Sequence, residues 1–242
     1  MILIQFILGE MESQFRLEGI YNTQSLSFFM SFGVKEWSFD FRPKSFNFIQ
    51  QYVFNDCINL LQNSLATHSV SMRFLNEKDF MVDKIVNDLK EISPLKNITF
   101  ELSETSDVAH AERNKIPFYW HYNFRLDSAV YQNPLLKGII LSAADCQRMQ
   151  ESNTLGRFII EFSKLKTEGM FKNQELILHF DWTQELMSSV LDFLPIDAFS
   201  LPINHQIETG YRQVNQELFK DHWTLLQKQL LSNGSTKSIN GP

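Results

Sequence analysis

Glycine is scarce in this sequence: 9 of its 242 residues are glycine, whereas 22 are phenylalanine. Loops that cradle a phosphate group need glycine, because the backbone must approach the anion closely. The composition therefore argues against a nucleotide- or phosphate-cradling loop. Basic residues are outnumbered by acidic ones, which gives a net charge of −6, and no window holds a dense Lys/Arg run. Nucleic-acid binding requires a basic surface, so we expect no nucleic-acid partner.

Cysteine is equally rare, with Cys57 and Cys146 the two examples, and they form no C-x-x-C pair. We interpret both as free, buried thiols in a reducing cytoplasm. The apolar start, residues 1–8, is much shorter than the roughly 20 residues that cross a bilayer, so we expect no membrane association. It also lacks the basic region and cleavage site of a signal peptide. Whether translation begins at Met1 or Met11 is left open.

Short apolar or β-branched runs alternate with amphipathic stretches along the chain. The predicted strands are residues 15–20, 36–41, 69–75, 98–102, 118–122, 138–141, 176–180 and 198–202. The predicted helices are residues 24–32, 46–62, 78–92, 106–114, 127–132, 144–166, 183–193 and 215–231. Eight such units without a G-x-G-x-x-G turn favour a closed (β/α)₈ TIM barrel over a doubly wound sheet.

No Ser/Gly-rich linker interrupts these units, which predicts an α/β fold with a single barrel domain over residues 13–231. Residues 1–12 would form an apolar extension, and residues 232–242, rich in Ser, Asn and Gly, a disordered tail. The oligomeric state is not readable from the sequence. In such barrels the chemistry lies at the C-terminal ends of the strands, so functional residues are sought there.

Several strand ends carry short motifs in a shared order. Residues 16–22 read R-L-E-G-I-Y-N, residues 39–45 read F-D-F-R-P-K-S, and residues 100–104 read F-E-L-S-E. They resemble the K-I-C-G-I-T-N, G-F-I-F-x-P-K-S and V-Q-L-H-G segments of phosphoribosylanthranilate isomerase, a tryptophan-biosynthesis enzyme. Residues 74–77, 176–185 and 207–210 also follow that family's pattern. The resemblance covers nearly the whole barrel and implies a divergent member of this isomerase family.

The residues that carry the family's activity do not match. The resemblance puts Glu18 where the family has a cysteine base and Ser142 where it has an aspartic acid. The substrate-binding arginine falls on Asn47, and the phosphate-binding A-G-G becomes H-F-D at residues 179–181. A serine has no acidic proton near neutral pH, and bulk with negative charge disfavours a phosphate dianion. We therefore expect that the isomerase activity has been lost.

The strand ends still offer candidates for other chemistry. We interpret Glu18 as a general base and His121 or His179 as an acid, since histidine titrates near neutrality. The predicted binding residues are Arg42, Arg73, Glu101 and Asp181. Two alternatives remain open for the acidic and histidine side chains: a metal site, or an ionic network in which arginines neutralise the acids. We favour the ionic network and expect no metal and no cofactor.

Three functions follow as hypotheses. The first is an isomerase-like barrel of altered specificity that acts on or binds a small, non-phosphorylated molecule at the strand ends. The second is a catalytically inactive barrel used as a binding or interaction module. The third is a retained phosphoribosylanthranilate isomerase. An open mouth in which Glu18 faces a histidine would favour the first, and a mouth plugged by Phe180, Trp182 and ion pairs would favour the second.

Overall fold

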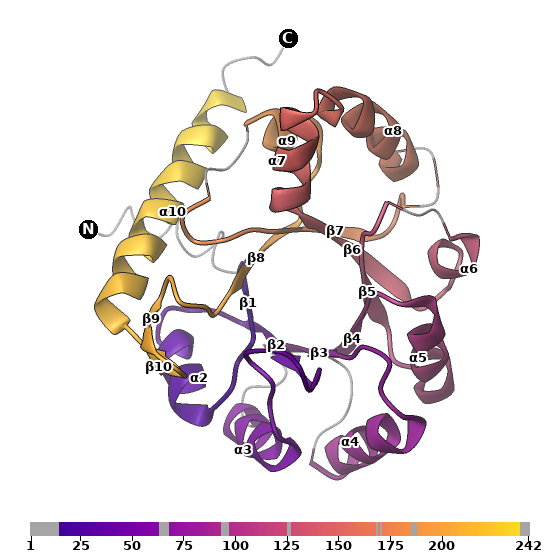
Figure 1. The fold of residues 1–242 in the computed structure, drawn as a ribbon, viewed down its shortest axis with the longest axis vertical. Helices are drawn as coiled ribbons and strands as arrows, with labels where there is room; N and C mark the ends of the chain where they lie inside the picture. The colour runs from indigo at the N-terminus through magenta and orange to yellow at the C-terminus, as the bar shows by residue number, and fades with distance from the viewer. Residues whose placement is uncertain are drawn as a thin grey trace.

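Eight parallel strands close into a barrel in the order in which they follow one another along the chain (Figure 1). The computed structural model describes residues 15–62, 68–92, 97–124, 127–167, 169, 171–184 and 188–237. The strands are β1 (Phe15–Glu18), β2 (Glu36–Asp40), β3 (Ser69–Arg73), β4 (Ile98–Leu102), β5 (Phe118–His121), β6 (Leu136–Ser142), β7 (Glu175–His179) and β8 (Ala198–Pro202). Strand β1 pairs with β2 and with β8, which closes the sheet. The predicted single-domain TIM barrel is confirmed.

The helices form a ring around the outside of the barrel (Figure 1). They are α2 (Thr23–Met30), α3 (Gln51–Leu61), α4 (Asp79–Ile92), α5 (Val108–Asn114), α6 (Ser128–Tyr131), α7 (Ala143–Glu151), α8 (Leu155–Thr167), α9 (Ser188–Phe193) and α10 (Gln216–Lys237), with a short 3₁₀ helix, η4 (Thr105–Asp107), before α5. The amphipathic pattern of residues 78–92 predicts an apolar stripe of Phe80, Val82, Ile85, Val86 and Leu89, and the last four are buried in α4. Phe80 does not belong to the stripe, because it is 70% exposed. Strand–helix alternation therefore follows the hydrophobic pattern of the sequence.

The single helix predicted over residues 144–166 is wrong, because two helices follow β6. Helix α7 ends at Glu151 and α8 begins at Leu155. Between them Asn153 has φ 57°, a left-handed conformation that ends a helix and that asparagine tolerates well. The hydroxyl of Ser152 also donates to the Arg148 carbonyl at 2.9 Å.

The segment after β8 contains a hairpin that the sequence pattern did not reveal, formed by β9 (Glu208–Gly210) and β10 (Gln213–Val214). Asn215 then caps α10, since its side-chain oxygen accepts a hydrogen bond from the Leu218 amide at 3.1 Å. Helix α10 continues to Lys237, so it enters the segment expected as a tail. The expected N-terminal extension and residues 238–242 lie outside the described residues.

Two hydrophobic clusters flank the strands. The larger one combines strand residues such as Leu17 and Phe39 with helix residues such as Phe54, whose ring centroid lies 4.9 Å from that of Phe39. A small second cluster consists of Tyr119, Ile140, Ile177 and Ala198. Because alternate strand residues face opposite sides, this second set lies on the interior side of the sheet. It fills only part of the barrel interior, and the remainder is polar.

The large aromatic residues of the strands and strand ends serve mainly in packing. Trp37, Trp120 and Trp182 belong to the larger cluster, between strands and helices. Tyr119 lies in the interior cluster, where its hydroxyl donates to Glu175 at 2.7 Å. The apolar stripe of α10 docks on the barrel as expected, with Trp223 4.7 Å from Phe15 between ring centroids.

Candidate functional site at the barrel mouth

Polar side chains gather where the strands end. Glu18, Arg73, His121 and His179 are the last residues of β1, β3, β5 and β7, and Glu101 is the next-to-last residue of β4. Parallel strands bring these ends to the same side of the barrel. Five of the seven predicted catalytic and binding residues therefore meet in one group. We call these five residues, with the contacts they make, the mouth cluster.

One half of the mouth cluster surrounds Glu18. Its Oε1 accepts a hydrogen bond from the Ser200 hydroxyl at 2.5 Å and lies 3.2 Å from Nδ1 of His179. Its Oε2 lies 3.8 Å from NH1 of Arg73. Burial alone would raise the pKa of Glu18, but the charge and hydrogen bond of His179, with the charges of Arg16 and Arg73, hold that pKa well below its usual range.

His179 shows the opposite side of the same interaction. Burial lowers the pKa of an imidazole, but the neighbouring Glu18 carboxylate outweighs this and raises the pKa of His179 above its ordinary value. The side chain of His179 is 28% exposed, compared with 8% for Glu18. The pair is thus a buried carboxylate beneath an imidazole that solvent reaches and whose protonated form the carboxylate favours.

The other half of the cluster surrounds Glu101, which is completely buried. Its carboxylate forms an ion pair with Arg16, accepts a hydrogen bond from Ser38, and lies 3.2 Å from Nε2 of His121. Burial opposes ionisation, but Arg16 and His121 together lower the pKa of Glu101 to about 2. This carboxylate is therefore permanently charged and fully partnered.

The pKa of His121 is shifted in the opposite direction from that of His179. Desolvation and the positive charge of Arg73 lower the pKa of His121 to about 4, although Glu101 favours its protonated form. The imidazole is neutral at physiological pH, and its side chain is 17% exposed. The pKa values of the two histidines at this mouth are thus shifted in opposite directions.

Arg16 is the central residue that the sequence reasoning missed. It is 1% exposed and precedes Glu18 by two positions on β1, so both side chains face the interior. The signal was present as an arginine in alternation with a predicted inward-facing glutamate. The expected ionic network exists, with Arg16 as a principal cation.

Two predicted binding residues stand apart from the cluster. Arg42 is held by Asp40, with Nε 2.9 Å from Oδ1 and NH2 2.6 Å from Oδ2. Asp181 is exposed and accepts a hydrogen bond from Nδ2 of Asn204 at 3.1 Å. Neither residue contacts Glu18, His121 or Glu101 in the contacts that the described residues make.

In the described part of the mouth, Phe180 and Trp182 do not form the plug that would favour an inactive module. Phe180 packs against Phe199, and Trp182 packs against Phe219 of α10, with ring centroids 5.9 and 5.3 Å apart. The indole of Trp182 also donates to the Pro202 carbonyl at 2.7 Å. Both aromatic side chains are therefore engaged on the helix side of β7 and β8.

The positions matched to the isomerase's acid and arginine have structural contacts here. Ser142 caps α7, with its hydroxyl 3.4 Å from the Asp145 amide. Asn47 is buried, and its Nδ2 donates to the Ile203 carbonyl at 2.5 Å. Asn47 also packs against Gly19, where an added Cβ would lie 2.3 Å from Nδ2. These side chains join loops to one another instead of facing the mouth cluster.

The backbone amides at the end of β7 already have acceptors. The Asp181 amide donates to Oε1 of Gln184 at 3.4 Å, and the Trp182 amide to Oε1 of Gln206 at 3.1 Å. The Gln206 amide donates to Oδ1 of Asn204 at 3.0 Å. Phosphate binding at strand ends depends on amides of this kind being free. Here side-chain amides occupy them.

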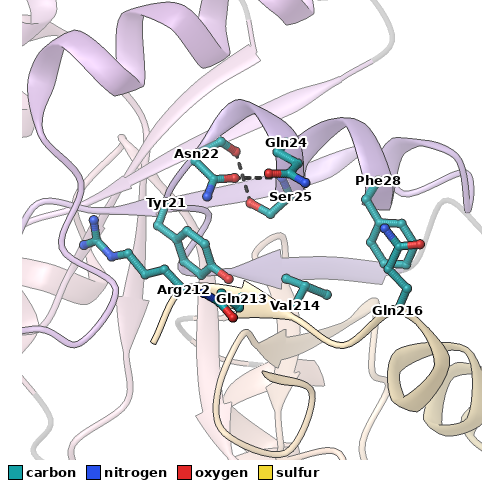
Figure 2. Close-up of a pocket in the computed structure, with 9 residues that line it drawn as sticks. All are labelled: Tyr21, Asn22, Gln24, Ser25, Phe28, Arg212, Gln213, Val214 and Gln216. Atoms are coloured by element: carbon teal, nitrogen blue, oxygen red, sulfur yellow. Dashed lines mark hydrogen bonds between the residues drawn. The ribbon is translucent and has the colours of Figure 1, made fainter. Parts of the chain in front are cut away.

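A pocket of about 150 Å³ lies between the start of α2 and the β9–β10 hairpin. Figure 2 shows Tyr21 and Arg212 together at one side and Phe28 and Gln216 at the other. None of the predicted catalytic or binding residues lines this pocket. Its lining residues are Tyr21, Asn22, Gln24, Ser25, Phe28, Arg212, Gln213, Val214 and Gln216.

The described residues include no group of three or more His, Cys, Asp or Glu side chains arranged to hold a metal ion. The two cysteines are free and buried, and burial raises the pKa of each thiol to about 12. Among the helices that the structure describes, none combines the length and apolar character needed to cross a bilayer.

The fold and the mouth cluster define a (β/α)₈ barrel with a polar site at the strand ends. No family model and no curated protein matches the sequence. Solved structures do match. Phosphoribosylanthranilate isomerase from Thermotoga maritima aligns with a TM-score of 0.57 and 13% identity, over 88% of this chain and 97% of that one.

Two further structures have the same fold. The isomerase from Thermus thermophilus gives a TM-score of 0.54 at 11% identity, over 89% of this chain and 98% of that one. Orotidine 5'-monophosphate decarboxylase from Sulfolobus solfataricus gives 0.50 at 9% identity, over 90% and 99%. The resemblance to the isomerase is therefore confirmed at the level of the fold. An isomerase and a decarboxylase share that fold, so the fold does not select a reaction.

Proposed function

We propose that this barrel acts on a small, non-phosphorylated molecule by acid–base chemistry at the mouth cluster. The proposal rests on two histidines at the mouth that solvent reaches, each 3.2 Å from a carboxylate oxygen, whose pKa values are shifted in opposite directions. The pKa of His179 is raised, and that of His121 is lowered to about 4. Groups whose environments push their pKa values apart are suited to be the acid and the base of one reaction.

In this proposal His179 is the general acid and His121 the general base. The carboxylate of Glu18 raises the pKa of His179, which favours its protonated form, and holds the imidazole in place. His121 has a free proton-accepting capacity at neutral pH because its pKa is low. Glu18, which the sequence suggested as the base, is a positioning residue here, since its side chain is 8% exposed and both of its oxygens already have partners: Ser200 and His179 at Oε1, and Arg73 at Oε2.

A non-phosphorylated substrate is supported by the strand-end amides of β7 and β8. The amides of Asp181, Trp182 and Gln206 donate to side chains of the same chain, which leaves them unable to surround a phosphate dianion. The exposed carboxylate of Asp181 beside them would also repel it. The ancestral isomerase reaction is disfavoured for the same reason, and because Ser142 supplies no acid.

The second candidate is a catalytically inactive barrel that serves as a binding module. The completely buried Arg16–Glu101 pair favours it, because a carboxylate locked in that way takes no part in proton transfer. The two candidates differ in the role of the accessible histidines, His121 and His179, which transfer protons in the first candidate and do not in the second. Either would be consistent with a cytoplasmic protein, which we propose because both cysteines are free thiols.

A thermal-shift screen with defined panels tests the proposal. The panels are small carboxylic acids, amines, neutral polyols and sugar phosphates, each measured against the native chain, His179→Gln, His121→Gln and His205→Gln. His205 is exposed and stands outside the mouth cluster, so it is the matched control. We expect stabilisation by non-phosphorylated compounds that both mouth variants lose and the control keeps.

Hits from the screen are then incubated with the native chain and followed by proton NMR for conversion or for exchange of a carbon-bound proton with deuterium. Exchange or conversion that His121→Gln abolishes would support the acid–base assignment. Binding without any exchange would favour the inactive module. Stabilisation only by sugar phosphates, or equally in all variants, would refute the proposed function.

A further inference from the structure

Among the described residues of the barrel interior and mouth, three are arginines, and two of them are unavailable to a ligand. Arg16 forms an ion pair with the Glu101 carboxylate and is 1% exposed, so a ligand does not reach its guanidinium. Arg42 holds both oxygens of Asp40 through Nε and NH2, a two-point pairing that uses the fork of its guanidinium.

Arg73 differs from both. Its closest carboxylate oxygen, Oε2 of Glu18, lies 3.8 Å from NH1, which is too long for a hydrogen bond. Within the described part of the chain, the Arg73 guanidinium donates no hydrogen bond. A guanidinium has five N–H donors, and this side chain is 20% exposed at the end of β3. An arginine is thus available to a ligand in the middle of the mouth cluster.

The charge around Arg73 favours an anion. The Glu18 carboxylate is already compensated by the His179 imidazolium, and the Glu101 carboxylate by Arg16. Among the described cations of the mouth, Arg73 lies farthest from its carboxylate partner, with NH1 3.8 Å from Oε2 of Glu18, so its charge is the least compensated. The solvent-facing side chains of the mouth cluster are this arginine and the two histidines, while both glutamates lie beneath them.

We infer that the substrate of the proposed site carries a carboxylate that binds the free guanidinium of Arg73. The inference rests on the proposed function for the location of the reaction, and it adds the chemical class of the substrate. A carboxylate is planar and matches the guanidinium fork through two parallel hydrogen bonds. A phosphate would need further donors around it, and the nearby amides of Asp181, Trp182 and Gln206 are taken.

The position of Arg73 also relates the carboxylate to the chemistry. Arg73 and His179 lie against the two oxygens of the same carboxylate, at 3.8 and 3.2 Å from Oε2 and Oε1 of Glu18, so the guanidinium and this imidazole are neighbours. A carboxylate bound to Arg73 would therefore bring its adjacent carbon toward the imidazole of His179. The geometry therefore suits proton transfer at a carbon or heteroatom next to the carboxyl group.

The test uses acetate as the probe, acetamide as its uncharged isostere and inorganic phosphate as a tetrahedral anion, at constant ionic strength. Binding is followed through the imidazole NMR signals of His121 and His179. The variants are Arg73→Gln, Arg73→Lys and, as matched control, Arg157→Gln on the exposed face of α8. We expect saturable binding of acetate, at least about tenfold weaker in Arg73→Gln and unchanged in the control.

We also expect Arg73→Lys to bind acetate less tightly than the native chain, since a lysine keeps the charge and loses the fork. Equal affinity of acetate for the native chain and Arg73→Gln, equal binding of acetamide, or tighter binding of phosphate would each overturn the inference. If acetate does not bind but another compound binds in a His179-dependent way, the carboxylate fails and the proposed function stands. If no compound of either experiment binds, both fail.

Discussion

Nδ1 of His179 lies 3.2 Å from Oε1 of Glu18, and this contact joins the ends of β7 and β1 across β8. The hydroxyl of Ser200, on the intervening strand, donates to the same carboxylate oxygen. Three strands that meet where the barrel closes therefore share one polar contact. This arrangement favours the protonated form of His179 at the mouth, so the stability that the contact contributes depends on pH.

The stability that His179 contributes should decrease at alkaline pH. Its pKa in the folded protein is above its ordinary value of about 6.5, so the ion pair is complete below that value and is lost as pH rises through the raised pKa. We expect the difference in unfolding free energy between the native chain and His179→Gln to shrink from pH 6.5 upward. Urea unfolding from pH 5.5 to 9 measures it, with His205→Gln as control. A constant difference would contradict the raised pKa.

His121 should destabilise the protein in mild acid. Its pKa is about 4 in the folded state and about 6.5 when unfolded, so the unfolded chain binds more protons between these values. Stability therefore falls as pH drops from 6.5 to 4, by at most about 3 kcal/mol from this residue. We expect His121→Gln to have a flatter profile over that range. Imidazole NMR signals of His121 that titrate near 6.5 would show the prediction to be wrong.

The barrel and most of its mouth were predictable from the sequence because strand alternation fixes which residues share a face. Glu18, Arg73, His121 and His179 end their strands, so locating the strands was enough to bring them together. The same alternation places Arg16, two residues before Glu18 on β1, on the interior face.

Other features depend on side-chain contacts that the hydrophobic periodicity of the sequence does not predict. Arg42 pairs with Asp40, two residues away, and does not join the mouth cluster. This pairing depends on the side-chain conformation of Arg42, which the sequence pattern does not specify. The β9–β10 hairpin turns at Tyr211 and Arg212, without an Asn-Gly or Asp-Gly signal, and Arg212 adopts φ 58°. The pKa shifts of His121 and His179 could not be predicted from the sequence either, since they depend on which charged side chains surround each imidazole.

The buried pair of Arg16 and Glu101 should show strong dependence of each residue on the other. Arg16→Met leaves a fully buried carboxylate without its cation, which we expect to lower the unfolding free energy by about 3–5 kcal/mol. The double variant Arg16→Met/Glu101→Met removes both charges and should be less destabilised than Arg16→Met alone. Urea denaturation of the native chain, Arg16→Met, Glu101→Met and the double variant provides the double-mutant cycle. Additive effects of the two substitutions would argue against direct pairing.

Gly19 should tolerate no side chain. Its φ is 82°, and an added Cβ would lie 2.3 Å from Nδ2 and 2.9 Å from Cβ of Asn47. A left-handed conformation costs a non-glycine residue roughly 1–2 kcal/mol, and the overlap with a buried side chain adds to it. We expect Gly19→Ala to lower stability by more than about 1 kcal/mol. Asn47→Ala removes the contact with Nδ2 but keeps the 2.9 Å contact with Cβ and the backbone strain. Urea unfolding should therefore show that Gly19→Ala costs less in an Asn47→Ala background than in the native chain, but still lowers stability.

Restoring the acid and base of the isomerase should not restore its reaction. The motifs match Glu18 to the family's cysteine and Ser142 to its aspartate, so Glu18→Cys/Ser142→Asp rebuilds that pair, and an aspartate at position 142 can still cap α7. The amides of Asp181 and Trp182 remain engaged with glutamine side chains, so a phosphate would still lack donors. We expect neither the native chain nor this variant to support growth of a tryptophan auxotroph lacking phosphoribosylanthranilate isomerase. An authentic isomerase expressed from the same plasmid must do so, and growth with the native chain would refute the proposed loss of the ancestral reaction.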